Sequence, residues 1–126
     1  MSIPSIVYKA HATGNDFVVY LDAEGTYEPT ADEVRFLCDR HFGIGGDGLI
    51  RLTHPQAVSD LNDKQIAVCA ADNADWFMDY RNADGSLAEM CGNGVRVFAH
   101  YVRATGLIDT DTFSVGSRAG ARPVIV

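Results

Sequence analysis

The sequence contains little of several residue types, and each scarcity excludes a class of protein. Its 126 residues include three cysteines, four prolines and one tryptophan, and the 10 Lys and Arg are outnumbered by 17 Asp and Glu. With a formal net charge of −7 and no basic cluster, the chain lacks the positive patch that nucleic acids and anionic membranes require. No apolar run reaches the roughly 18 residues of a membrane-spanning helix. Neither a nucleic acid nor a membrane is therefore an expected partner.

The three cysteines, Cys38, Cys69 and Cys91, are odd in number and lie far apart. Without a Cys-x-x-Cys pair, they indicate neither a zinc site nor a redox dithiol. The first four residues show none of the charged and apolar segments of a signal peptide. Free thiols without such a signal favour a cytoplasmic location, where the surroundings are reducing.

The remaining composition is that of an ordinary globular domain, with 47% hydrophobic and 21% charged residues. Residue types predict strands at 5–9, 17–21, 49–52, 66–70, 76–81, 112–115 and 123–126. The pair Asp84-Gly85 predicts a tight turn after the fifth of these strands, followed by an antiparallel return.

Two helices are expected. A capping box formed by Thr30 and Glu33 predicts the start of a helix that runs to about residue 42, with His41 on its buried face. A second helix is expected over about 91–105. Because its apolar residues cover most of its circumference, it has the pattern of a buried helix.

The run Gly43-Ile44-Gly45-Gly46-Asp47-Gly48 has the spacing of the dinucleotide-binding fingerprint G-x-G-x-x-G. That fingerprint needs a strand before it and a helix after it, whereas here a helix precedes and a strand follows. A phosphate would find no helix N-terminus to bind. We interpret the run as a turn that links helix to strand, or as a loop that borders a substrate pocket.

The run Met90-Cys91-Gly92-Asn93-Gly94 places a cysteine at the start of the second helix. The helix dipole there lowers the pKa of a thiol and favours the thiolate. The two glycines leave the first amides accessible to a carboxylate, and Asn93 can bond a carboxylate or an ammonium. Such a site suits an amino-acid substrate. The alternative is a buried structural cysteine with a Gly-rich cap, although each glycine costs the helix roughly 1 kcal/mol.

The other candidate bases are weaker. Cys38 and Cys69 lie in apolar stretches, where a free cysteine usually packs as a small hydrophobe. His11 and His41 are interpreted as polar loop or packing residues. Because no histidine is identifiably paired with Cys91, a thiol hydrolase is disfavoured.

Four motifs occur in order along the chain: Gly14-Asn15-Asp16-Phe17, Gly43-Ile44-Gly45-Gly46-Asp47, Tyr80-Arg81-Asn82-Ala83-Asp84-Gly85-Ser86 and Met90-Cys91-Gly92-Asn93-Gly94-Val95-Arg96. In this order and at these distances, the sequence resembles the N-terminal half of the diaminopimelate epimerase family. The block at 76–101 is most similar to the actinobacterial type. Any one motif is weak, but the four together are specific, and the resemblance covers essentially the whole chain.

The resemblance implies an α+β fold, in which a curled, mostly antiparallel sheet or barrel surrounds a central helix. It implies interconversion of LL- and meso-2,6-diaminopimelate, for lysine and peptidoglycan synthesis, without pyridoxal phosphate or a metal. Cys91 would be one catalytic acid/base thiol. The positions that match substrate-contacting residues of the family are Asn15, Asn82, Gly92 and Asn93.

The same resemblance implies that residues 1–126 form the N-terminal domain of a two-domain epimerase, whose members are often homodimers. The C-terminal domain, with the second catalytic cysteine, would lie outside this chain. The chain stops within the strand predicted at 123–126, without a polar tail, so we expect the natural protein to continue.

Two positions depart from the family pattern. Gly48 stands where many members have a glutamine that touches substrate, so that contact is absent here or supplied otherwise. Ala12 follows His11 where the family usually has glycine. Two alternatives stay open: another cofactor-independent amino-acid racemase or isomerase of this fold, and a non-catalytic amino-acid-binding half-domain. A Cys-Gly-Thr-Gly-like segment further along the gene would favour the enzyme.

Overall fold

The computed structural model describes residues 3–12, 14–88 and 92–125, with only the backbone described at Asn93. Its elements follow in the order β1 (Tyr8–Ala12), β2 (Asn15–Leu21), α1 (Ala31–Cys38), β3 (Gly48–Thr53), the 3₁₀ turn η1 (Pro55–Ala57), α2 (Asp63–Ala71), β4 (Phe77–Asn82), α3 (Gly92–Ala104), β5 (Thr112–Ser117) and β6 (Gly120–Ile125).

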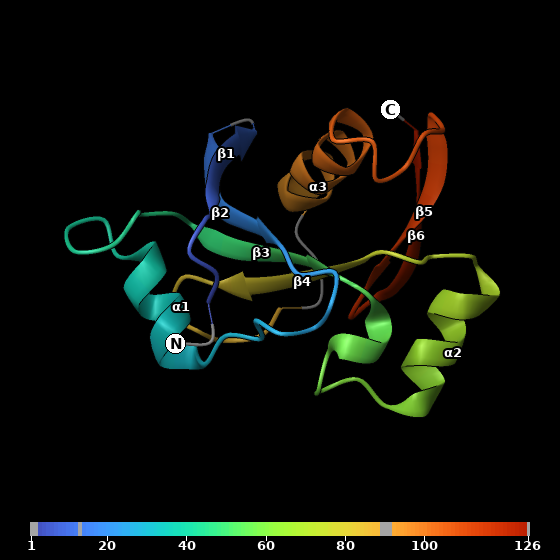
Figure 1. The fold of residues 1–126 in the computed structure, drawn as a ribbon, viewed down its shortest axis with the longest axis horizontal. Helices are drawn as coiled ribbons and strands as arrows, with labels where there is room; N and C mark the ends of the chain where they lie inside the picture. The colour runs from blue at the N-terminus through green and yellow to red at the C-terminus, as the bar shows by residue number, and fades with distance from the viewer. Residues whose placement is uncertain (1–2, 13, 89–91, 126) are drawn as a thin grey trace.

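The strands form one six-stranded sheet in sequence order, from β1 to β6. Neighbours pair antiparallel at β1–β2, β3–β4 and β5–β6, and parallel at β2–β3 and β4–β5. The sheet curls, so that β1 and β2 lie on one side of α3 and β5 and β6 on the other (Figure 1). The α+β fold with a sheet curled around a central helix is confirmed. The sheet is mixed, and in the described part of the chain it does not close into a barrel.

Helix α1 begins where expected and ends early. The Thr30 hydroxyl accepts a hydrogen bond from the Glu33 amide at 3.2 Å, and the Glu33 carboxylate accepts one from the Thr30 amide at 2.9 Å, which completes the capping box. The helix ends before Asp39, whose carboxylate accepts hydrogen bonds from the amides of His41 and Phe42 and turns the chain. The prediction that the helix buries His41 is therefore wrong, since His41 is exposed.

Residues 63–71 form helix α2, so the strand predicted at 66–70 is wrong. Asn62 caps this helix: its side-chain oxygen accepts from the Gln65 amide at 2.8 Å, and the Gln65 side chain accepts from the Asn62 amide at 2.9 Å. Cys69 is buried in a small core under the helix, as expected for a thiol that packs as a hydrophobe.

Two larger cores lie on opposite faces of the sheet. Side chains alternate along each strand, and in β2 this alternation directs Phe17 and Val19 towards one core and Val18 and Tyr20 towards the other. Helix α1 covers the face of Val18, and α3 covers the face of Phe17. The two helices thereby remove both faces of the central strands from water.

Helix α3 is buried on one side only. Phe98 and Val102 are fully buried against the sheet, whereas Arg96 and His100 on the outer side are exposed. The prediction of a helix buried nearly all round is therefore wrong. Gly106 ends the helical segment with a φ of 79°, in the left-handed region that glycine tolerates best.

A cluster of charged side chains is buried in the sheet. Asp79, 0% exposed, accepts from Arg51 Nε at 2.7 Å, from Arg118 Nη2 at 2.7 Å and from Arg81 Nε at 3.2 Å. Arg51, also 0% exposed, reaches Asp22 at 2.7 Å. Burial alone would raise the pKa of Asp79, but the nearby Arg118, Arg81 and Arg51 outweigh burial and lower that pKa. Asp79 is therefore a buried carboxylate that is ionised and paired.

The β5–β6 hairpin joins the rest of the sheet through few backbone contacts. The described register between β4 and β5 is one pair, Phe77 with Gly116, and the Gly116 amide donates to the carbonyl of Trp76 at 2.9 Å. Arg118, between β5 and β6, adds its contact with Asp79. The buried charge cluster therefore ties the hairpin to β4.

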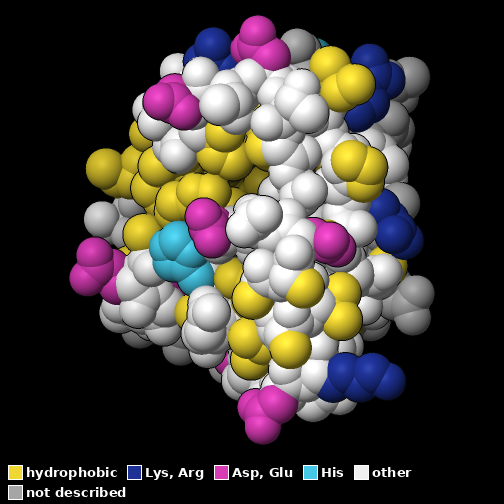
Figure 2. All heavy atoms as spheres, turned by 90° about the vertical axis from the view of Figure 1, so that its right-hand side faces the viewer, with side chains coloured by type: hydrophobic (Ala, Val, Ile, Leu, Met, Phe, Trp, Pro, Cys, Tyr) yellow, Lys and Arg dark blue, Asp and Glu magenta, His cyan; other side chains and the backbone are white. Residues whose placement is uncertain are grey.

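The side of the molecule that carries β5, β6 and α2 lies away from α1 (Figure 1). Figure 2 looks onto it, and hydrophobic side chains gather there in a hollow, among scattered acidic and basic groups. Next to α2, the rings of His54 and Trp76 stack with centroids 4.3 Å apart. None of the helices in the described ranges combines the length and apolar character needed to cross a bilayer.

Replacing Asp79 with alanine would leave three arginines around a buried gap. We expect the free energy of unfolding to fall by about 3–5 kcal/mol, because one partner of a buried charge cluster is lost, as measured by urea titration. The matched control is Asp111→Ala: Asp111 pairs with Arg103 at the surface and its side chain is 72% exposed. That loss should cost under about 1 kcal/mol. Equal losses in the two variants would contradict the importance of the buried cluster.

Candidate active site

Asn15 and Asn82, both predicted to bind substrate, lie at the same end of the sheet. Asn15 is the first residue of β2, and Asn82 is the last residue of β4. Between these strands, Gly48 begins β3 and pairs with Phe17 on one side and Asn82 on the other. The strand register therefore brings the two asparagines to the same end of the sheet, with β3 between their strands.

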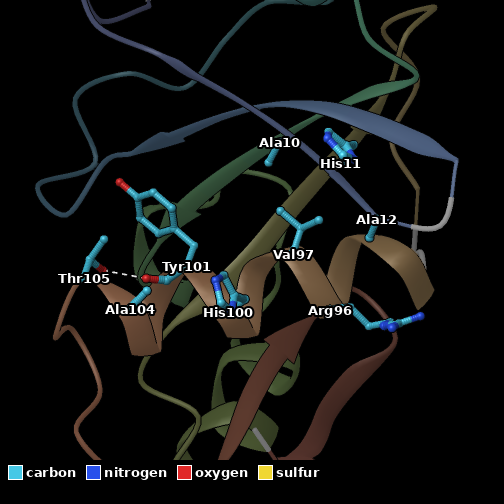
Figure 3. Close-up of a pocket in the computed structure, with 9 residues that line it drawn as sticks. All are labelled: Ala10, His11, Ala12, Arg96, Val97, His100, Tyr101, Ala104 and Thr105. Carbon is cyan, nitrogen blue, oxygen red and sulfur yellow. Dashed lines mark hydrogen bonds between the residues drawn. The ribbon is translucent and has the colours of Figure 1, made fainter.

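The start of α3 lies at this end of the sheet too. Ala12 ends β1 and pairs with Asn15, and it lines a groove together with Arg96, near the start of α3. Figure 3 shows Ala12 beside this first part of the helix. Gly92, the first helical residue, is exposed, and a Cβ added there would meet no described atom within 4 Å. The first amides of the helix, which have no partner within the helix itself, are thus not covered by a side chain at 92.

Two of the predicted site residues cannot be located in the same way. Cys91 lies outside the described residues, and at Asn93 only the backbone, within α3, is described. Their roles stay predictions from the sequence. Of the predicted set, the structure brings Asn15, Asn82 and Gly92 to one end of the sheet.

A groove of about 420 Å³ runs between β1 and α3 along the outer side of the helix. His11 lines it from β1, and Arg96, His100 and Tyr101 line it from α3 (Figure 3). None of the described residues predicted to bind substrate lines it, so the groove adjoins this end of the sheet through Ala12 without including Asn15, Asn82 or Gly92. Within the described ranges, no group of three or more His, Cys, Asp or Glu is placed to hold a metal ion.

The Gly-rich loop at 43–48 connects α1 to β3, as expected from the sequence. Its amides donate back to the end of α1: Ile44 and Gly45 to the Leu37 carbonyl at 3.0 and 2.9 Å, and Gly46 to the Cys38 carbonyl at 3.1 Å. Gly45 has a φ of 86°, which the tight turn requires and glycine allows. Because these amides already have partners, the loop is not a phosphate cradle, and the interpretation as a structural turn is confirmed.

Asp47, in the same loop, connects the two asparagine-bearing segments. Its Oδ2 atom accepts from Asn15 Nδ2 at 3.2 Å, and its carbonyl accepts from the Ala83 amide at 3.3 Å. Asn82 is held in turn by Ser86, whose Oγ accepts from Asn82 Nδ2 at 3.0 Å. Contacts within the protein therefore orient both asparagines.

Asp16 is a charged residue of this region that sequence analysis did not single out. Its carboxylate accepts two hydrogen bonds from Arg40 at 2.8 Å each and lies 3.0 Å from Lys9 Nζ. Arg40 and then Lys9 lower the pKa of Asp16 far below its usual range. Asp16 and Asp47 fall inside motifs used for the family resemblance, which is the signal that could have found them. No such signal marks Arg40 or Lys9, which lie outside the four motifs.

Gly48, which departs from the family pattern, has no room for a side chain. A Cβ at this position would lie 2.7 Å from the Tyr80 ring, 2.8 Å from its hydroxyl and 2.8 Å from the Arg81 carbonyl. The phenol of Tyr80 thus fills the space into which a residue at 48 would project. This packing explains why glycine stands here.

The two described thiols are unsuited to proton transfer at neutral pH. Cys38 is 5% exposed and Cys69 is 1% exposed. Burial raises the pKa of Cys38 to about 11 and also raises the pKa of Cys69. Both are free thiols, and burial keeps them protonated, which confirms their interpretation as packing residues.

The fold and the described site residues define the class: an α+β domain with polar side chains at one end of its sheet, beside the start of its central helix. The family model described as diaminopimelate epimerase matches residues 7–126. The chain belongs to the diaminopimelate epimerase family.

Several relatives are similar along most of this chain. It is 53% identical over 118 residues to diaminopimelate epimerase of Rhodococcus opacus (strain B4), covering 94% of this chain and 41% of the relative. Identity is 50% over 121 residues with the diaminopimelate epimerase of Mycolicibacterium smegmatis, covering 96% and 42%. The chain is 49% identical over 118 residues to the diaminopimelate epimerase of Thermobifida fusca, and the match covers 94% of this chain and 42% of that relative. The chain therefore spans about two fifths of the length of these relatives.

The close packing around Gly48 leads us to predict how a substitution there changes the stability of the protein. Gly48→Ala should lower the free energy of unfolding by about 1–3 kcal/mol, because the added Cβ must displace the Tyr80 ring or the Arg81 carbonyl. Gly92→Ala is the control, since its Cβ meets open space and alanine favours a helix. Urea unfolding of both variants provides the measurement. A Gly48→Ala protein as stable as the unsubstituted one would show that the contact is not tight.

The burial of Cys38 and Cys69 leads us to predict the order in which the three cysteines react with an alkylating reagent. Brief alkylation near neutral pH should modify Cys91 before Cys38 and Cys69, because only a thiolate reacts quickly and burial keeps both described thiols protonated. Peptide mapping measures the order, and labelling in denaturant, where all three should react alike, is the control. Earlier labelling of Cys38 or Cys69 would refute Cys91 as the reactive thiol.

Proposed function

We propose that this chain is the N-terminal domain of a diaminopimelate epimerase, which interconverts LL- and meso-2,6-diaminopimelate. The observation that carries the proposal is 53% identity over 94% of the chain to a relative of that name. Such an enzyme serves lysine and peptidoglycan synthesis. Free, buried Cys38 and Cys69 support a cytoplasmic location, since a reducing compartment keeps thiols unpaired.

The proposed site places Cys91 as an acid/base thiol at the start of α3. Asn15, Asn82, Gly92 and Asn93 bind the polar groups of the substrate. Support comes from the register that brings Asn15 and Asn82 to the same end of the sheet, on either side of β3, and from the exposed residue Gly92. The substrate carboxylate binds the amides of the first helical turn, where the helix dipole favours an anion.

The reaction needs a second thiol on the opposite face of the substrate. One cysteine, as thiolate, takes the α-proton from one face, and the other, as thiol, gives a proton to the opposite face. One proton is removed and one is added, so no cofactor is required by the balance. Cysteine suits both roles because its reference pKa of about 8.5 lies near the working pH. Asn15, Asn82 and the helix amides stabilise the negative charge that develops on the substrate.

The second thiol belongs to a C-terminal domain that this chain does not include. Support for that domain is the coverage of only 41% of the relative's length. The two domains close over the substrate and exclude water. We also propose that the complete enzyme is a homodimer, in keeping with the family resemblance.

This assignment predicts that the 126-residue chain alone does not epimerise diaminopimelate, because it supplies a thiol to one face only. The measurement is incubation with LL-diaminopimelate in deuterated water, followed by detection of α-deuterium and of the meso isomer. Addition of a matching C-terminal domain should restore both signals. Formation of the meso isomer by the chain alone would overturn the two-base assignment.

Two variants of the reconstituted enzyme serve as controls for the site. Cys91→Ala should abolish turnover, since no other group takes the proton on that face. Asn82→Ala should lower kcat/KM by a factor that corresponds to about 1–3 kcal/mol, the cost of an unpaired polar group in a closed site. An unchanged kcat/KM for Asn82→Ala would remove that residue from the site.

A further inference from the structure

Arg40, in the turn after α1, connects two segments that enter the candidate site. Its Nη1 and Nη2 atoms each donate to an oxygen of the Asp16 carboxylate, at 2.8 Å. Nη2 also donates to Oδ1 of Asp47 at 3.2 Å. Asp16 follows Asn15 in β2, and Asp47 immediately precedes β3. One guanidinium therefore fixes two carboxylates at the entries of two neighbouring strands.

The other oxygen of Asp47 reaches a proposed substrate-binding residue. Asp47 Oδ2 accepts from Asn15 Nδ2 at 3.2 Å and from the Asp16 amide at 3.1 Å. The Asp47 amide in turn donates to the Asp16 carbonyl at 2.8 Å. The contacts thus run from Arg40 through Asp47 to the side-chain amide of Asn15. A carboxylate with one oxygen held by Arg40 presents its other oxygen to Asn15 in one orientation.

Stabilisation of the fold is a weak explanation for these ion pairs. The side chain of Arg40 is 56% exposed and that of Asp47 is 41% exposed, and ion pairs in contact with water contribute little to stability. A guanidinium that binds a carboxylate through two parallel hydrogen bonds mainly fixes direction.

Loss of Arg40 would affect Asp47 more than Asp16. Asp16 would keep Lys9, whose Nζ lies 3.0 Å away. Among the described residues, Arg40 is the cation within ion-pair distance of Asp47. Without it, the two neighbouring carboxylates repel each other, and the Asp47 carboxylate keeps only its backbone contact with the Asp16 amide to orient the oxygen that accepts from Asn15.

We propose that Arg40 is a positioning residue for the substrate. It fixes Asp47, and Asp47 orients the side-chain amide of Asn15 before the amino-acid substrate binds. This inference rests on the proposed function, in which Asn15 contacts the substrate. Arg40 itself touches no reacting atom, so its loss weakens binding more than it slows the chemical step.

The test compares Arg40→Gln, Arg40→Lys and the unsubstituted protein in the complete, two-domain enzyme. We expect Arg40→Gln to raise KM for diaminopimelate roughly tenfold, the scale of one charge-assisted hydrogen bond, with kcat changed less than about twofold. Arg40→Lys should give an intermediate KM, because an ammonium keeps the charge and lacks the planar fork.

The matched control is Arg103→Gln. Arg103 also pairs with one exposed aspartate, Asp111, near the end of α3 and away from Asn15. Its replacement should leave KM unchanged. Equal KM values for Arg40→Gln and Arg103→Gln, or a loss in kcat alone for Arg40→Gln, would overturn the proposal.

A second measurement keeps the inference separate from the proposed function. The side-chain amide NMR signal of Asn15 should shift in Arg40→Gln and stay in place in Arg103→Gln, with no substrate present. An unmoved Asn15 signal in a folded Arg40→Gln protein would refute the positioning role, whatever the enzyme catalyses. A shifted signal in an enzyme that never turns over diaminopimelate would refute the proposed function, and the orientation of Asn15 by Arg40 would stand.

Discussion

The burial of Asp79 constrains most of the sheet. A carboxylate without exposure to water needs opposite charges around it, and its three arginines come from different elements: Arg51 from β3, Arg81 from β4 and Arg118 from the β5–β6 turn. Arg51 and Asp79 are direct partners in the β3–β4 register. A slip of one residue would move Asp79 to the other face of the sheet, into the apolar core under α3 and away from these charges.

The register that pairs the buried charges also aligns the candidate site. Arg51 lies opposite Asp79, so Gly48 lies opposite Asn82 at the end of the same ladder. The parallel ladder between β2 and β3 then sets Phe17, and with it the entry of β2, beside Gly48. The register of the buried strands thus sets which strand ends lie together at one end of the sheet. The polar contacts of the Gly-rich loop join segments that the sheet register places side by side.

The parts of the fold that were predictable depend on a few neighbouring residues, as in the capping box of α1 and the turn after β4. Helix α2 carries the same signal, Asn62 with Gln65, but the apolar residues behind it also fit a strand, and periodicity cannot separate the two in so short a run. The prediction that His41 is buried was wrong because the Asp39 carboxylate accepts hydrogen bonds from the amides that follow it, which ends the helix before His41. In the site, contacts such as Arg40 with Asp16 join residues 24 positions apart, which meet only once the sheet has formed.

The short pairing between β4 and β5, a single pair in the described register, has a spectroscopic consequence. The one tryptophan of the sequence, Trp76, lies beside this pairing. Its carbonyl accepts a hydrogen bond from the Gly116 amide of β5, while its ring stacks on the ring of His54. Indole emission responds to the polarity and contacts of the ring. The protein therefore carries an intrinsic optical reporter at the place where the hairpin meets the rest of the sheet. Its fluorescence would follow separation of the hairpin as an event of its own, in a molecule with no added label.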